Sequence, residues 1–203
     1  MLRYTEKRGQ SGHTIEEEVL GEVTRPAAES YDEWKKHESR DRQIFKVAVE
    51  NVKKCQPPEA KPSRPAWPFP KRVHALIMDK IGSFPQPLLD IIDDGHLKYF
   101  TCVHYGEMDY RRGIDAIFEL ELLGIKDGKP IIVSLDITTD PNSDELPKAN
   151  VVFSWPRAGL DPELAEDREE WEQKVEEVAS QAAIVLESWL NKINRSQKER
   201  RVA

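Results

Sequence analysis

The chain has 203 residues, of which 33% are charged and 38% hydrophobic, and its formal net charge is -7. This length suits one ordinary core with appendages and is short for two full domains. The acidic balance argues against a protein that holds nucleic acid over a broad basic surface, because that mode needs many Lys or Arg contacts to phosphate. This charge balance does not exclude a localised groove that binds nucleic acid.

Cysteine spacing and apolar runs indicate the compartment. Cys55 and Cys102 are isolated, with no Cys-x-x-Cys spacing, so neither a zinc cluster nor a disulfide framework is expected. No apolar run approaches the roughly 20 residues that cross a bilayer, and the first residues lack the apolar core of a signal peptide. We therefore expect reduced thiols in a soluble, cytoplasmic protein.

The N-terminal quarter is predicted to contain a tail and a helix. Residues 1–25 are polar and mixed, and we expect a disordered or irregular tail. A long amphipathic helix is predicted over 26–55, because Pro26 suits a first helical position and apolar residues recur at helical spacing after it.

A proline-rich stretch follows over 56–70. Its six prolines remove backbone donors and fix φ, which predicts an extended linker. Trp67 and Phe69 near its end are expected to anchor the linker on the chain's own core. The alternative is a peptide that docks in an aromatic-lined groove of a partner.

Residues 71–160 are predicted to form an α/β core. Its strongest signal is a β-hairpin within 112–139, because Asp127-Gly128 between two apolar runs favours a tight reversal. Helical spacing and β-branched or aromatic content predict the remaining elements. They are helices over 71–81 and 87–97 and strands over 98–104 and 151–155.

The segment 161–203 is predicted to be an amphipathic helix with a basic tail. Asp161-Pro162-Glu163 is a favourable helix start, and the helix is expected to end near residue 195. Apolar residues three and four apart form one seam. They are Trp171, Val175, Val178, Ala182, Val185, Trp189 and Ile193. The seam is expected to pack on the chain's own sheet or N-terminal helix; the alternative is an interface with another copy or a partner.

Together these elements predict an α/β (α+β) fold. We expect a small mixed sheet with a central β-hairpin, flanked by helices, with long N-terminal and C-terminal helices.

The hairpin holds acidic residues where buried strands would hold apolar ones. Because side chains alternate along a strand, Asp115 and Glu119 share a face of the first run, and Asp136 and Thr138 share a face of the second. Clustered carboxylates are costly to keep ionised without a cation, and oxygen ligands favour Mg²⁺ or Mn²⁺. The predicted metal ligands are Asp115, Asp136 and Glu119. The alternative is a solvated sheet face that binds nothing.

At these residues the chain resembles the PD-(D/E)xK nuclease-like (restriction-endonuclease-like) superfamily. Residues 113–118 are similar to the family's Asp on its second core strand, and 131–138 to the acid-x-Lys triplet on its third. The resemblance covers roughly 71–155. It implies a catalytic site at Asp115, Asp136 and Thr138, with Thr138 standing where the family has its catalytic Lys.

A second polar cluster precedes Asp115. His104, Glu107 and Asp109 could supply further metal ligands, and Arg111 and Arg112 could meet phosphate. The alternative is a plain polar turn.

Two functions follow as hypotheses. The resemblance implies a metal-dependent phosphodiesterase that acts on DNA or RNA with Mg²⁺ or Mn²⁺. The absent Lys favours the alternative of a catalytically inactive scaffold, which would bind a protein partner or a second copy through its C-terminal helix.

Overall fold

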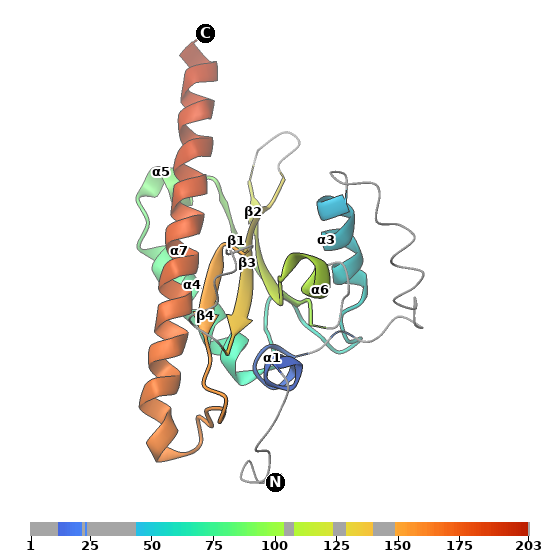
Figure 1. Ribbon diagram of the computed structural model, residues 1–203. Helices are drawn as coiled ribbons and strands as arrows, with labels where there is room; N and C mark the ends of the chain where they lie inside the picture. The colour runs from blue at the N-terminus through green and yellow to red at the C-terminus, as the bar shows by residue number, and fades with distance from the viewer. Residues whose placement is uncertain are drawn as a thin grey trace. The chain divides into compact units, whose positions relative to one another are not determined.

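The computed structural model describes residues 12–21, 23, 44–103, 108–123, 129–139 and 149–202 (Figure 1). The chain divides into two compact units. The first comprises residues 1–61, 100–117 and 134–159, and the second comprises residues 62–99, 118–133 and 160–203.

A four-stranded sheet has the order β1-β2-β3-β4. Its strands are β1 (Ile92–Thr101), β2 (Ala116–Leu122), β3 (Ile131–Thr138) and β4 (Val151–Ser154). β3 and β4 are parallel, with Leu135 opposite Val151 and Thr138 opposite Ser154. The chain between β2 and β3 is too short for a parallel crossover, so these two strands form the predicted antiparallel hairpin.

β1 and β2 are also antiparallel. The Cys102 N–H, just after β1, donates to the Asp115 carbonyl just before β2 (2.7 Å), and the Leu123 N–H, just after β2, donates to the Ile91 carbonyl just before β1 (3.0 Å). The sheet is therefore mixed, and the predicted α/β fold class is confirmed. The turn residues Asp127 and Gly128 lie outside the described residues.

The first unit contains the helices α1 (Gly12–Leu20), α3 (Ile44–Lys54) and α6 (Asp109–Arg112). The irregular tail expected over 1–25 is corrected by α1, in which Ile15, Val19 and Leu20 form a buried stripe at helical spacing. Only the end of the helix predicted over 26–55 falls on described residues. It is α3, whose Ala48, Val49 and Val52 are buried.

The second unit contains the helices α4 (Pro68–Gly82), α5 (Gln86–Leu89) and α7 (Ala165–Val202). α4 begins inside the predicted linker, because prolines are tolerated in a first helical turn. Phe69 is buried against Trp171 of α7, with ring centroids 6.2 Å apart at 84°. Phe69 therefore anchors on the chain's own core, whereas Trp67 is 39% exposed.

The helix predicted over 87–97 is wrong. α5 ends at Leu89 and β1 begins at Ile92. A short apolar run such as Leu88 to Ile92 fits a helix and a strand equally well, and pairing with β2 decides in favour of the strand. The Tyr99 N–H of β1 donates to the Pro62 carbonyl (2.9 Å), so the proline-rich segment contacts this strand at Pro62.

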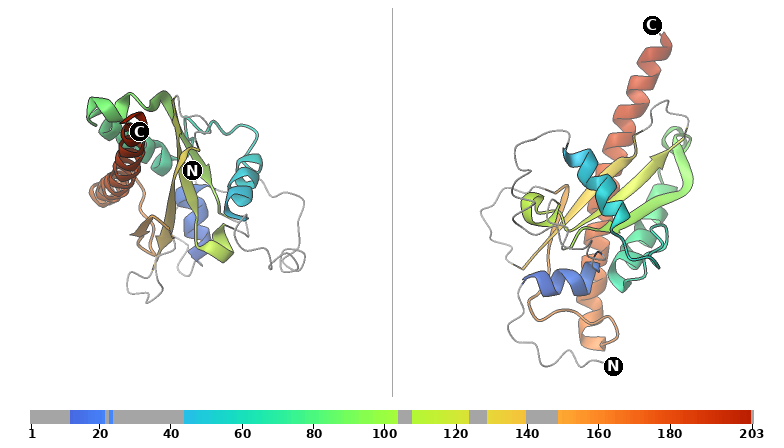
Figure 2. Two further views of the ribbon diagram at one scale, coloured as in Figure 1. Left: turned by 90° about the horizontal axis from the view of Figure 1, so that it is seen from above. Right: turned by 90° about the vertical axis from the view of Figure 1, so that its right-hand side faces the viewer.

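α7 packs against α4 and α5 in the second unit, and Figure 2 shows α7 running beside α4. The first part of the predicted seam is buried, from Trp171 to Ala182. Farther along, Val185 and Ile193 are half-buried and Trp189 is 47% exposed. The helix continues past the predicted end near 195 to Val202. Across the described segments, no helix is both long enough and apolar enough to span a membrane.

Candidate metal centre

Three carboxylates meet in the first unit. They come from Glu16 in α1, from Asp109 at the start of α6, and from Asp115, which directly precedes β2. One carboxylate oxygen from each lies within 4.8 Å of the others. Asp109 and Asp115 are buried, and Glu16 is half-buried. This geometry could hold a metal ion.

The backbone and side chain of Asp115 are fixed by the sheet. Its N–H donates to the Leu135 carbonyl (2.9 Å), and its own carbonyl accepts the Cys102 N–H (2.7 Å). Its Oδ2 accepts the Ile137 N–H (2.7 Å). The carboxylate is therefore held in one orientation by a main-chain donor rather than by a flexible side chain.

Burial determines the protonation of Asp115, which is only 3% exposed. Desolvation raises its pKa to about 9, with smaller contributions from the negative charges of Glu16, Asp136 and Asp109; the hydrogen bond from Ile137 acts in the opposite direction. In the absence of a cation, Asp115 is therefore protonated at neutral pH. A bound cation would favour its ionised form.

A glycine in the left-handed backbone conformation ends α6, the short helix that carries Asp109. Gly113 has φ of 55°, and its N–H donates to the Asp109 carbonyl (2.8 Å). The Ile114 N–H donates to the carbonyl of Met108, a fully buried residue (3.0 Å). This tight closure returns the chain toward the start of α6, and so brings Asp109 near Asp115.

The three side chains of this group supply carboxylate oxygens as ligand atoms. Oxygen-only sites suit hard cations such as Mg²⁺ and Mn²⁺. Cys102 lies nearby, but burial raises its pKa well above the ordinary value, and the charges of Asp115 and Asp109 raise it further. In the absence of a cation, its thiol is therefore protonated at neutral pH.

The predicted ligands Asp136 and Glu119 are not members of this group of three. Asp136 is half-buried in β3, and its charge contributes to the raised pKa of Asp115. Glu119 is buried in β2. Residues four apart along a strand share a face but lie about 13 Å apart, so a common face alone does not let Asp115 and Glu119 share one ion.

Thr138, the third residue of the predicted catalytic site, is half-buried at the end of β3, and its carbonyl accepts the Trp155 N–H (2.8 Å). Of the lysines that flank β3 in the sequence, Lys148 lies outside the described residues. Lys129 is exposed just before β3.

The polar cluster at 104–112 is only partly described. Asp109 belongs to the carboxylate group, while His104 and Glu107 lie outside the described residues. The guanidinium carbon of Arg112 lies 5.4 Å from the centroid of the Phe45 ring, which connects α6 to α3.

Sequence reasoning did not find Glu16. The stripe of Ile15, Val19 and Leu20 could have indicated α1, but no local pattern relates a residue near the N-terminus to Asp115. Only the tertiary fold brings these two carboxylates together.

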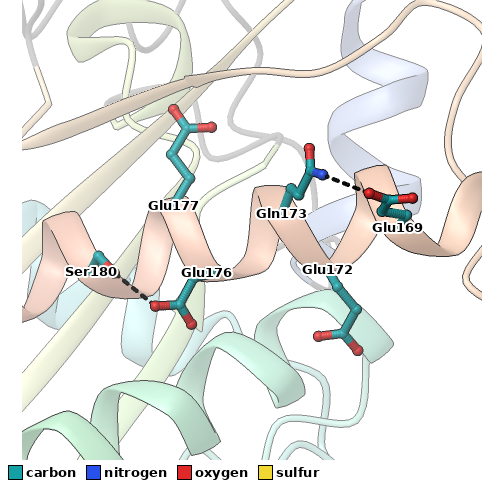
Figure 3. A pocket seen from close by; sticks show the side chains of 6 residues that line it. All are labelled: Glu169, Glu172, Gln173, Glu176, Glu177 and Ser180. Atoms are coloured by element: carbon teal, nitrogen blue, oxygen red, sulfur yellow. Dashed lines mark hydrogen bonds between the residues drawn. The ribbon is translucent and has the colours of Figure 1, made fainter.

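A second acidic surface lies on α7 in the second unit. An open hollow of about 510 Å³ is lined by Glu169, Glu172, Gln173, Glu176, Glu177 and Ser180 (Figure 3). Glu172 pairs with Arg72 (3.4 Å) and Glu176 with Lys80 (2.6 Å), both on α4. The hydrogen bond from Lys80 is the main reason that the pKa of Glu176 is lowered. These ion pairs connect the acidic face of α7 to α4. We therefore interpret this surface as a solvated helix face and assign no ligand to it.

Comparisons of the chain with protein-family models, with curated proteins and with solved structures found no match.

Proposed function

We propose that this protein is a divalent-metal-dependent phosphodiesterase of the PD-(D/E)xK nuclease-like kind, acting on nucleic acid. The observation that carries the proposal is the meeting of Glu16, Asp109 and Asp115 from three separate elements, with oxygens within 4.8 Å of one another. Asp115 is also the residue that resembles the family's first catalytic acid. Asp136, which resembles the second, lies close enough for its charge to act on Asp115.

The chemistry needed is hydrolysis of a P–O bond. A Mg²⁺ or Mn²⁺ ion on these carboxylates would lower the pKa of a bound water and neutralise charge on the phosphate. The water oxygen would form a bond to phosphorus as the bond to the leaving oxygen breaks, and the proton that the water gives up would pass through solvent to the leaving oxygen. The role of Asp115 is to present a carboxylate whose orientation is fixed by the Ile137 N–H.

Two further features agree with this proposal. Cys55 and Cys102 are free thiols, which fits the cytoplasmic location that we propose. The acidic net charge favours a localised nucleic-acid contact at the metal centre over a broad basic surface.

A cleavage assay tests the proposal. The wild-type chain is incubated with single-stranded and double-stranded DNA and RNA in Mg²⁺, in Mn²⁺ and in EDTA. We expect metal-dependent cleavage that Asp115→Asn reduces on the order of 100-fold or more, because a lost ligand should cost at least as much as a lost outer-shell partner. Glu170→Gln, on the exposed face of α7, is the matched control and should cleave like the wild type. Equal cleavage by Asp115→Asn would exclude this site.

A second candidate function is a catalytically inactive scaffold that binds a protein partner or a second copy through α7. The exposed apolar side chains of this helix favour it, because Ile184 is 66% exposed and Trp189 is 47% exposed. The apolar seam also continues to Ile193, beyond Leu190, the last fully buried residue of the helix.

A further inference from the structure

We propose that Thr101 is a positioning residue for the metal centre, because its buried hydroxyl holds the end of α1 and thereby places Glu16 beside Asp115. This inference rests on the proposed metal-binding function. It concerns only residues of the first unit, and Thr101 itself contributes no ligand atom to the carboxylate group.

The hydroxyl of Thr101 acts on the C-terminal end of α1. Thr101 is 5% exposed, and its Oγ1 donates to the Gly21 carbonyl (2.6 Å). Gly21 has φ of 78° and ends the helix, with its N–H donating to the Glu17 carbonyl (2.9 Å). Helix ends leave carbonyls without helical partners, and a buried one needs a donor. Thr101 supplies that donor within two helical turns of Glu16.

The backbone of Thr101 is itself held by Gln56, which lies two residues past the end of α3. The Gln56 side chain donates from Nε2 to the Thr101 carbonyl (2.9 Å), and its Oε1 accepts the Thr101 N–H (3.3 Å). The same Nε2 donates to the Val52 carbonyl near the end of α3 (3.0 Å). The hydroxyl that holds α1 therefore projects from a backbone position with fixed partners.

The next residue connects Thr101 to the other side of the metal centre. The Cys102 N–H donates to the Asp115 carbonyl (2.7 Å). Adjacent residues thus hold α1, which carries Glu16, and the backbone of Asp115. Metal sites tolerate only small errors in ligand placement, so releasing one of these two attachments should weaken ion binding without removing a ligand.

The test measures Mn²⁺ affinity by calorimetry on the full chain, with folding verified by circular dichroism. Thr101→Val keeps the side-chain shape and removes the donor, and we expect affinity to fall about 10-fold. Thr101→Ser keeps the hydroxyl and should restore affinity to near the wild-type value. Ser134→Ala is the matched control: it removes another buried hydroxyl of the same unit, one bonded to Asn150, and should leave affinity unchanged.

A double variant distinguishes the positioning of Glu16 from a general loss of order in the protein. In a Glu16→Gln background, Thr101→Val should cause no further loss of Mn²⁺ affinity, because the side chain that it positions is already altered. If Thr101→Val does not fold, Thr101→Ala replaces it in both comparisons. Unchanged affinity in the folded Thr101 variant, or an equal loss in Thr101→Ser, overturns this inference alone. No Mn²⁺ binding by the wild type overturns both this inference and the proposed function.

Discussion

Asp115 combines a structural and a chemical role in one side chain. Its Oδ2 bonds the β3 backbone, while its carboxylate also faces Glu16 and Asp109. A buried acid of this kind is costly to ionise unless a cation is present. The residue that stabilises the sheet is therefore also the residue whose charge state should report on ion binding.

The raised pKa of Asp115 predicts how stability depends on pH. The group is protonated in the folded chain up to about pH 9 but ionises near its ordinary value of 3.8 in the unfolded chain. The unfolded state therefore binds fewer protons between these values. In EDTA, the stability that this group contributes is fully present below about pH 4 and falls by at most about 1.4 kcal/mol per pH unit as pH rises toward 9.

Asp115→Asn should remove this dependence. The Asn side-chain carbonyl can still accept the Ile137 N–H, and it never ionises. Urea unfolding in EDTA at pH 5, 7 and 9 should therefore show the variant gaining stability relative to the wild type as pH rises. A stability difference that is constant across these pH values would contradict the protonation state that we assign to Asp115.

At the scale of elements, local patterns predicted the elements with clear periodicity or turn chemistry. The hairpin was predicted from the two apolar runs on either side of Asp127-Gly128, and α7 was predicted from its apolar seam and its Asp161-Pro162 start. The prediction of a helix over 87–97 was wrong, because the apolar run is compatible with either a helix or a strand and pairing with β2 favours the strand.

The metal centre was predictable only in part. Asp115 stood out as an acid at the start of an apolar strand, and Asp109 stood out within a polar cluster. Glu16 did not, because its place in the centre depends on long-range contacts such as that between Thr101 and Gly21. No periodicity within a short window encodes such a contact.

The exposed apolar side chains of α7 allow a test of whether this helix forms an interface. Trp189→Glu replaces a side chain that is 47% exposed and should leave the fold intact. If α7 binds a second copy, light scattering after size exclusion should show an oligomer for the wild type and a monomer for this variant. Val178→Glu is not a clean test, because Val178 is fully buried and its replacement would disrupt the core. A wild-type monomer at all concentrations would contradict self-association.

At the scale of the whole molecule, the chain forms two compact units, and its three candidate ligands all belong to the first. The central claim is that this unit holds a divalent cation. That claim does not depend on whether the protein cleaves nucleic acid, or on whether Thr138 can serve in place of a Lys. It can be tested before any substrate is known.

Calorimetric titration of the full chain with Mn²⁺ tests this claim most directly. We predict saturable binding that Glu16→Gln and Asp109→Asn each weaken by about 10-fold to 100-fold, because each removes a charged ligand. Glu170→Gln on α7 should bind like the wild type. The absence of Mn²⁺ binding, or binding that neither Glu16→Gln nor Asp109→Asn weakens, would contradict the account.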